Sequence, residues 1–398
     1  MSQTSTVPGV KGRLFTWDYI FTCVTTFFFF SGFHLLLPGM PIYVEALGGS
    51  EFEVGLVMGA FTVTAVVLRP WVGPSTDVRG RRLFMLIGAF IFLTAHFAYN
   101  FATSVPLLIA LRLWHGVGMA CFMTAAPALI ADLAPPPRRG EALGYFGAVT
   151  GVTMAVTPAV GIALLNAYGF TVMFFTSAAV ALTAVVLAFF VSEPKRPRPN
   201  GGSSRPALVS RAALMPSALV MALTLTYGAL ITFVPLYALK QGMSNPGLFF
   251  MVYAMAMVVS RPIAGRLSDI FGRTAVTVPG LLLAAAAMWL LAISSSVPLL
   301  FVVAALYGLG FGTAYPALMA LLADRVEVGQ RGAGMATFTA AFDLGIGIGS
   351  IFWGLVVQFT GFGIMFFASG LAPAASVLYL GFQRLTKHGR EDARGDRP

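Results

Sequence analysis

A charged segment reads Arg69-Pro70-Trp71-Val72-Gly73-Pro74-Ser75-Thr76-Asp77-Val78-Arg79-Gly80-Arg81-Arg82, and a second copy reads Arg261-Pro262-Ile263-Ala264-Gly265-Arg266-Leu267-Ser268-Asp269-Ile270-Phe271-Gly272-Arg273-Thr274. The copies lie 192 positions apart, from 69 to 261 and from 77 to 269 alike. Apolar runs flank both copies, so each predicts a short charged turn between two apolar helices. A turn that recurs once per half indicates two related halves. The positions that both copies share include Gly73, Asp77 and Arg81 in the first and Gly265, Asp269 and Arg273 in the second.

The same offset relates further glycines and charged residues outside the two copies. Chance would not keep one offset through so many small or charged positions, so an internal duplication is predicted. These pairs are Gly55 and Gly247, Gly116 and Gly308, Gly118 and Gly310, Asp132 and Asp324, and Arg139 and Arg331.

The amino-acid composition indicates a protein that is embedded in a lipid bilayer. Of 398 residues, 58% are hydrophobic and only 10% are charged, whereas a soluble domain carries about 25% charged residues. Such a chain cannot coat a water-facing surface. The two cysteines, Cys23 and Cys121, lie in apolar runs and predict no disulfide framework. The first apolar run, 15–37, is too long for a signal-peptide core and is interpreted as a retained span.

Twelve apolar runs approach the roughly 20 residues that a membrane-spanning helix needs. The sequence therefore predicts an all-α membrane protein with twelve transmembrane helices. The predicted spans are 15–37, 54–73, 83–100, 105–131, 141–164, 170–191, 212–238, 247–265, 274–294, 297–322, 332–357 and 363–382.

A polar, Pro- and Gly-rich segment divides the spans into two sets of six. The predicted domains are an N-terminal bundle, 1–191, a linker, 192–211, a C-terminal bundle, 212–383, and a polar tail, 384–398. Pro and Gly disfavour regular structure in such a linker.

The basic residues predict the orientation in the membrane. All but two of the 25 Lys and Arg residues fall on one side of the predicted spans, the exceptions being Arg112 and Lys240. Cytoplasmic loops collect positive charge, so we expect both termini in the cytoplasm and the protein in the cell (inner) membrane. The basic excess is thereby explained as topology, and nucleic-acid binding is not predicted.

Six helices, a basic linker and six more helices resemble the major facilitator superfamily over essentially the whole chain, and the Gly73…Asp77…Gly80-Arg81-Arg82 segment resembles that family's signature between helices two and three. The resemblance implies two pseudo-symmetric six-helix bundles around a central cavity. It also implies that the signature residues latch the halves on the cytoplasmic side when the cavity opens outward. From the residues alone, the turns either gate or only anchor topology, and Arg69 and Arg261 either gate or extend to lipid headgroups.

Asp343 is a charged residue deep in a predicted span. It lies eleven residues from the start of the eleventh span, about 16 Å into the membrane at about 1.5 Å per residue. A carboxylate removed from water favours its protonated form, so Asp343 is the first candidate for a proton carrier. Thr339 shares its helix face and is expected to line the substrate cavity. A structural carboxylate bonded to a partner helix is the alternative.

Arg112 lies inside the fourth span with His115 one turn further on. Arg112 either faces the cavity, where it holds an acidic substrate group or influences a carboxylate, or is satisfied by backbone carbonyls. The segment resembles the fourth-helix signature of proton-linked members of the family, which commonly have Gln where this chain has His115. His115 is a candidate for the substrate cavity, and His34, in the first span, is the alternative proton site.

Small residues form a stripe along the fifth span. Gly147, Gly151 and Pro158 share one helix face, which favours close helix packing. The Thr157-Pro158-Ala159-Val160-Gly161 segment partly resembles the fifth-helix signature of the family's antiporters, which favours export. Packing without any bearing on direction is the alternative.

Together these features predict a secondary transporter that moves a small-molecule substrate by alternating access. Proton-coupled efflux of a drug or metabolite is favoured. Uptake or facilitated exchange of a sugar, carboxylate or metal chelate remains open, as does a receptor or scaffold that moves nothing. The expected partners are the substrate, protons and the lipid bilayer, and a monomer is expected. The sequence has no catalytic constellation and no metal-ligand spacing, so neither an enzyme nor a cofactor is predicted.

Overall fold

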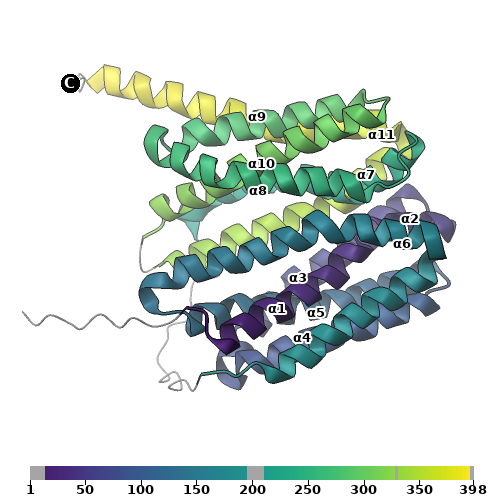
Figure 1. Cartoon of the computed structure of the whole chain (residues 1–398). Coiled ribbons are helices and arrows are strands. Elements are labelled where there is room, and N and C mark those ends of the chain that lie inside the picture. The colour runs from purple at the N-terminus through teal and green to yellow at the C-terminus, as the bar shows by residue number, and fades with distance from the viewer. Residues whose placement is uncertain (1–13, 195–209, 328–329, 395–398) are drawn as a thin grey trace, which may run out of the picture.

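The computed structural model describes residues 14–194, 210–327 and 330–394. Its helices form two groups, one below the other in Figure 1. The first group contains α1 (Trp17–Leu36), α2 (Gly39–Ala46), α3 (Glu51–Arg79), α4 (Arg81–Ala98), η1 (Tyr99–Phe101), α5 (Val105–Leu133), η2 (Pro136–Arg138) and α6 (Arg139–Phe190). The second contains η3 (Arg211–Ala213), α7 (Leu214–Lys240), α8 (Gly247–Phe271), α9 (Arg273–Ala292), α10 (Val297–Arg325) and α11 (Arg331–Arg394).

The described helices supply twelve spans. Ten helical segments are long and apolar enough to cross a membrane. Two of them, in α6 and α11, are each broken by a glycine with positive φ, Gly169 (φ 80°) and Gly361 (φ 80°). Each therefore contains two spans, which raises ten to twelve and confirms the predicted number. The two breaks are themselves 192 positions apart, as the repeat requires. Glycine stands at each because it adopts a positive φ readily.

The signature segments are mostly helix, so the prediction of a turn over 69–82 and 261–274 is wrong in extent. α3 continues through Pro70 and Pro74 to Arg79, and the reversal of direction takes place at Gly80 (φ 96°). In the second copy α8 continues to Phe271 and reverses at Gly272 (φ 90°). Membrane helices tolerate internal proline, because neighbouring groups satisfy the freed backbone.

The duplication extends to how helices touch. A Cβ added to Gly118 of α5 would lie 3.0 Å from the carbonyl oxygen of Gly88 in α4. A Cβ added to Gly310 of α10 would lie 2.8 Å from the carbonyl oxygen of Gly280 in α9. A side chain larger than that of glycine would not fit at either contact. The two glycines of the second contact each lie 192 positions after their counterparts in the first. The α4–α5 crossing thus recurs as the α9–α10 crossing, which confirms two pseudo-symmetric halves.

We call the end of the molecule with Gly80 and Gly272 the linker face, and the end with the turns at Gly48 and Gly242 the far face. The two groups meet through α3 with α11 and α6 with α8. The close backbone contacts of these pairs lie toward the far face. A Cβ on Gly354 would lie 2.9 Å from the carbonyl oxygen of Glu51.

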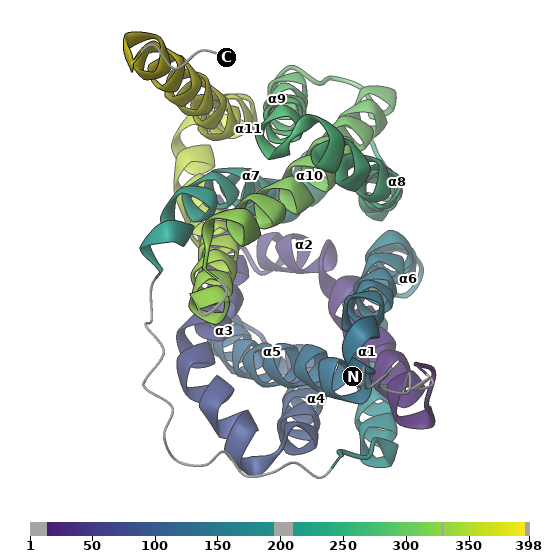
Figure 2. The same ribbon diagram turned by 90° about the vertical axis from the view of Figure 1, so that its left-hand side faces the viewer.

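Toward the linker face the same four helices are apart. Gly73 of α3, Gly147 of α6 and Gly265 of α8 have open space where a Cβ would be, with nothing within 4 Å. Figure 2 looks onto the linker face and shows the ribbons of both groups end-on or nearly so. The structure is therefore closed at the far face and open at the linker face.

Two segments have more helix in the structure than the predicted spans contain. The segment between the first two predicted spans, 15–37 and 54–73, forms the short helix α2. α11 continues to Arg394, so most of the predicted polar tail is helical. Residues 195–209 of the predicted linker and 395–398 of the tail lie outside the described residues.

Candidate functional site

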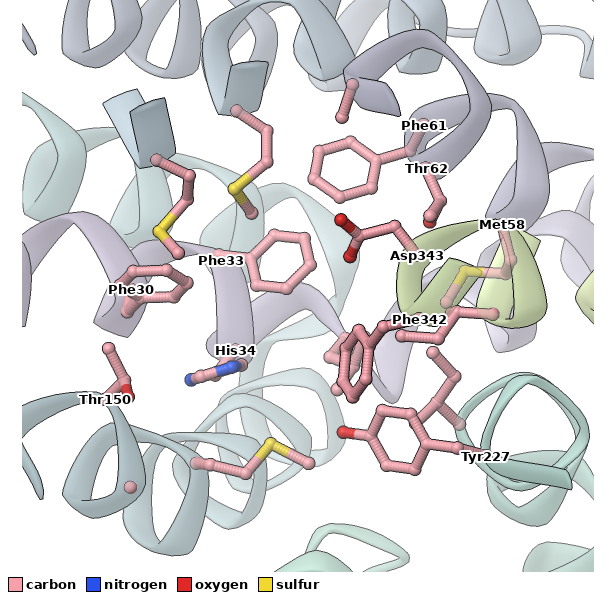
Figure 3. A pocket seen from close by; sticks show the side chains of 18 of the residues that line it. Phe30, Phe33, His34, Met58, Phe61, Thr62, Thr150, Tyr227, Phe342 and Asp343 are labelled. Carbon is pink, nitrogen blue, oxygen red and sulfur yellow. The ribbon is translucent and has the colours of Figure 1, made fainter. Parts of the chain in front are cut away.

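A cavity of about 320 Å³ lies between the two groups of helices, and both groups line it (Figure 3). Most of the lining is aromatic, aliphatic or methionine, which suits an apolar ligand body. Its polar and ionisable lining residues are His34, Thr62, Arg69, Arg112, Thr150, Tyr227, Tyr253, Arg261 and Asp343.

Asp343 forms an ion pair with Arg69 across the cavity. The Arg69 guanidinium on α3 donates to the Asp343 carboxylate on α11, so the pair joins the two groups. The side chains are 26% and 17% exposed, respectively. Arg69 is thus directed into the protein rather than to lipid headgroups. Sequence reasoning placed Asp343 in the membrane but did not identify this partner, although a buried carboxylate demands a cation.

The surroundings of this pair are largely apolar. In Figure 3 the Asp343 carboxylate lies between Phe61 and Thr62 on one side and Phe342 on the other. Tyr315 of α10 contributes a further ionisable group that interacts with both Asp343 and Arg69. Its ring packs against Phe342 at 5.2 Å between centroids. A charge change at Asp343 would therefore be screened poorly.

Arg112 lines the cavity but is held mainly by backbone and ring contacts. Its Nε donates to the carbonyl oxygen of Val57 at 3.2 Å, and its guanidinium lies 4.7 Å from the Phe61 ring centroid. The side chain is only 2% exposed. This arrangement matches the backbone-satisfied alternative, and a cation–π contact contributes further stabilisation.

The two candidate histidines occupy different environments. His34 lines the cavity (Figure 3). Its Nδ1 lies 2.9 Å from Thr153 Oγ1. His115 does not line the cavity. It is fully buried in the first group, with Nδ1 2.8 Å from the Tyr99 hydroxyl and its ring 4.1 Å from that of Phe92. We expected His115 to line the substrate cavity, but the structure places it in the interior of the first group of helices.

Thr339 also lies outside the cavity lining. Its hydroxyl donates to the carbonyl oxygen of Met335 in the preceding turn, at 2.8 Å. Thr339 is one turn nearer the linker face than Asp343, where the two groups of helices have separated. The four-residue spacing places Thr339 and Asp343 on the same face of α11. The sequence does not show that this face leaves the cavity lining at Thr339.

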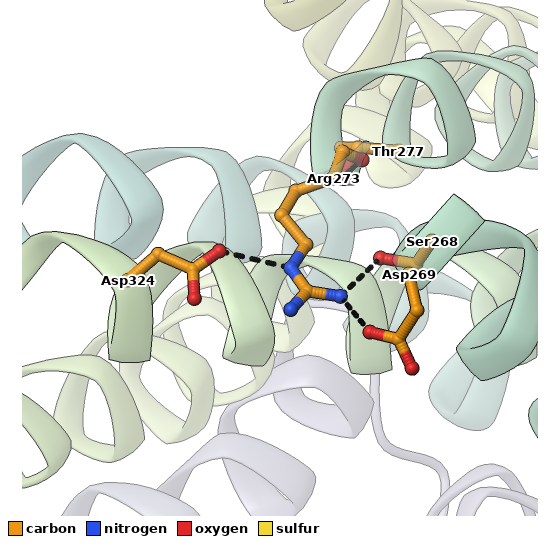
Figure 4. A network of polar contacts seen from close by, with 5 residues as sticks. All are labelled: Ser268, Asp269, Arg273, Thr277 and Asp324. Atoms are coloured by element: carbon orange, nitrogen blue, oxygen red, sulfur yellow. Dashed lines mark hydrogen bonds and ion pairs between the residues drawn. The ribbon is translucent and has the colours of Figure 1, made fainter. Parts of the chain in front are cut away.

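The signature residues form one polar cluster in each group. In the second, Arg273 donates to Asp324 at 2.9 Å and also bonds Asp269 and Ser268 (Figure 4). These contacts tie α8, α9 and α10 together.

The cluster in the first group repeats this plan. Arg81 lies 2.5 Å from Asp132 and 3.6 Å from Asp77, and so connects α3, α4 and α5. Asp132 and Asp324 are equivalent positions of the repeat. The ion pairs described for each cluster join helices of one group, so these pairs do not latch the two halves together here.

The small-residue stripe of α6 is packed at one end only. At the far-face end, a Cβ on Gly247 of α8 would lie 2.5 Å from the Cα of Ala159, next to Pro158. Gly151 lines the cavity, and a Cβ there would lie 3.6 Å from Val258. Gly147, nearer the linker face, has no such neighbour.

Metal coordination has no candidate among the described residues. No group of three or more His, Cys, Asp or Glu side chains is placed there to hold an ion. The cavity lining itself offers groups for ion pairing, hydrogen bonding and apolar contact.

Comparison with known proteins agrees with this architecture. The profile of the Major Facilitator Superfamily matches residues 22–255 and 244–398. The staphylopine export protein of Staphylococcus aureus is 26% identical over 382 residues, covering 91% of this chain and 94% of that protein. The quinolone resistance protein NorA of Staphylococcus aureus is 24% identical over 217 residues, covering 54% and 55%.

A solved structure shares the fold. A POT family transporter in complex with a thioalcohol-conjugated peptide matches with a TM-score of 0.77 at 12% identity, covering 92% of this chain and 96% of that chain. The chain has twelve spans in two repeated halves, with a cavity between them. The family profile matches most of its sequence. The chain belongs to the Major Facilitator Superfamily and is a secondary transporter rather than an enzyme.

Proposed function

We propose that the protein exports a small amphipathic molecule in exchange for protons, and that Asp343 carries the proton. The proposal rests on the Arg69–Asp343 ion pair, which joins α3 to α11 inside the cavity. Ionisable groups at this depth are costly, and they commonly mark proton relays and substrate paths. Two relatives, an export protein and a quinolone resistance protein, support export as the direction.

The proposal includes an orientation. The linker face is the cytoplasmic side of the cell (inner) membrane, with both termini there, since the basic residues gather at that face. The structure is then an inward-open state. The moving bodies are residues 1–191 and 212–383, connected by 192–211, and one copy of the chain is sufficient because each copy encloses its own cavity.

Coupling follows from competition at one carboxylate. Ionised Asp343 attracts Arg69 and accepts hydrogen bonds from a donor group of the substrate, so the substrate binds the deprotonated form. A proton that arrives from outside neutralises Asp343, which weakens both attractions and releases the substrate. The protonated protein then returns inward and loses the proton to the cytoplasm. The charged and ionisable neighbours that set this balance are Arg69 on α3 and Tyr315 on α10.

Proteoliposomes with a pH gradient test the proposal. Candidate substrates come from a growth-inhibition panel that compares cells with and without the protein. A pH-sensitive dye inside the vesicles reports proton movement as each candidate is added. Proton flux opposite to substrate flux is expected, and it should vanish in Asp343→Asn.

The possible results separate the alternatives. Flux of both species in the same direction would indicate uptake. No substrate movement for any candidate that binds would indicate a receptor or scaffold. Unchanged pH-driven transport by Asp343→Asn would place the proton elsewhere, with His34 next.

A further inference from the structure

The two halves of the repeat carry different residues at one position that lines the cavity. Arg69 and Arg261 are equivalent, 192 positions apart, and both line the cavity. The position equivalent to Asp343 is Gly151, which also lines the cavity. The carboxylate that pairs with the first arginine therefore has no counterpart for the second.

Arg261 lacks a strong acceptor among the described residues. Its Nη2 lies 3.6 Å from the Met257 sulfur, a weak acceptor, and its buried Nε has no hydrogen-bond partner there. Tyr227 and Tyr253 line the cavity with it. A buried guanidinium N–H that has no acceptor is costly, because it has given up its hydrogen bond to water.

The charges of the cavity lining do not balance. Three arginines and one aspartate line it. Arg69 is neutralised by Asp343, and Arg112 is held by a backbone carbonyl and the Phe61 ring. Arg261 is left as a positive charge without compensation from the lining. A charge inside a membrane protein normally has a partner, and the described lining residues supply no carboxylate for Arg261 beyond the one that pairs with Arg69.

We propose that Arg261 binds a carboxylate group of the transported molecule. The planar fork of guanidinium N–H donors fits a carboxylate through two parallel hydrogen bonds. The aromatic wall formed by Tyr227, Tyr253 and Phe311 receives the apolar body next to it. The inference rests on the proposed function for the second contact, the donor group at Asp343, and so identifies the substrate class as amphipathic molecules with a carboxylate and a hydrogen-bond donor.

Binding of two matched probes tests this inference without transport. The protein is placed in phosphatidylcholine nanodiscs, and its affinities for naphthylacetate and for naphthylacetamide are measured by calorimetry. The probes share the ring system and differ in charge. We expect the acid to bind about 10- to 100-fold more tightly than the amide, as one charge-assisted pair allows.

Variants of Arg261 test whether this residue causes the tighter binding of naphthylacetate. In Arg261→Gln the two probes should bind equally, whereas Arg261→Lys should retain part of the preference. Arg266→Gln is the matched control, because Arg266 is an exposed arginine on the same helix outside the cavity lining. Equal binding by the wild-type protein, or a preference that survives Arg261→Gln, would overturn the inference.

A substitution in the other half provides a second test. Gly151→Asp introduces a carboxylate at the position equivalent to Asp343, and a Cβ there would make only an ordinary contact of 3.6 Å with Val258. Arg261 then has an internal partner, so the preference for naphthylacetate should fall at least 10-fold, by the same pair strength. A preference that persists in a folded Gly151→Asp protein would contradict the assignment.

Two further outcomes separate the possible sources of the anion. If phosphatidylglycerol in the nanodisc abolishes the acid preference, the site takes a lipid headgroup and the inference fails. If it does not, the site takes a free carboxylate. Since these measurements use no pH gradient, their failure leaves proton-coupled export standing, and loss of proton coupling with retained acid preference would overturn only the proposed function.

Discussion

Arg69 and Asp343 are 274 positions apart in the chain, yet their side chains form an ion pair between α3 and α11. The pair lies between the bundle-closing contacts of the far face and the separated helix ends of the linker face. It is therefore placed where a change of charge alters the contact between the two groups of helices.

The first prediction concerns the stability of this pair. Arg69→Gln and Asp343→Asn each leave one charge inside the cavity, and we expect each to cost about 1–3 kcal/mol, since the partners are only partly exposed. The double variant removes both charges and should be more stable than at least one single variant. Thermal unfolding in detergent measures all four proteins, and strictly additive losses would contradict an interaction between the two side chains.

The second prediction compares the two signature clusters, which are equivalent in the repeat but not in burial. Arg81 is 14% exposed and its partner Asp132 is 24% exposed, whereas Arg273 and Asp324 are 26% and 53% exposed. Exposed ion pairs contribute little. Arg81→Gln should therefore destabilise the protein by roughly 1–3 kcal/mol, and Arg273→Gln by under about 1 kcal/mol. Chemical denaturation provides the comparison, and a larger loss for Arg273→Gln would show that burial does not govern these clusters.

The third prediction uses glycines at opposite ends of the same interfaces. Gly59→Trp places a large ring where α3 meets Gly347 of α11, a contact of 2.8 Å from a Cβ on Gly59 to the Gly347 oxygen. This variant should prevent closure of the far face. Gly147→Trp fills open space at the linker face and should instead hold that face open.

Distances between spin labels distinguish these states. The exposed Val78 and Ile270 suit labels on the linker face, in a background without Cys23 and Cys121. We expect Gly59→Trp to shorten the Val78–Ile270 distance and Gly147→Trp to leave it long. Identical distance distributions in the two variants would argue against rocking of the two groups about the cavity.

The membrane spans were predictable from the sequence, whereas the contacts between helices were not. Repeat register and apolar run length were sufficient for the twelve spans, because both can be read from the sequence without knowing which helices touch. They also placed Asp343 at cavity depth. The pairing of Asp343 with Arg69 could not be predicted, since it depends on how two separate bundles face each other. His115 and Thr339 were misplaced for the same reason: helix spacing determines which residues share a face, but not what that face meets. The length of α3 through Pro70 and Pro74 was missed, because proline signals a break unless neighbouring helices support the bend.

The last prediction concerns the two candidate histidines, His34 as the alternative proton site and His115 as a candidate for the substrate cavity. His34 lines the cavity and bonds only Thr153, whereas His115 is fully buried against Tyr99. His34→Gln keeps a polar group at Thr153, so it should alter substrate affinity a few-fold and leave proton coupling intact. His115→Phe removes the partner of a buried hydroxyl and should cost about 1–3 kcal/mol. Tyr99→Phe combined with His115→Phe removes both polar groups and should recover part of that loss. Flux assays and thermal unfolding on the same preparations measure the two effects, and loss of proton coupling in His34→Gln would transfer the proton site from Asp343 to His34.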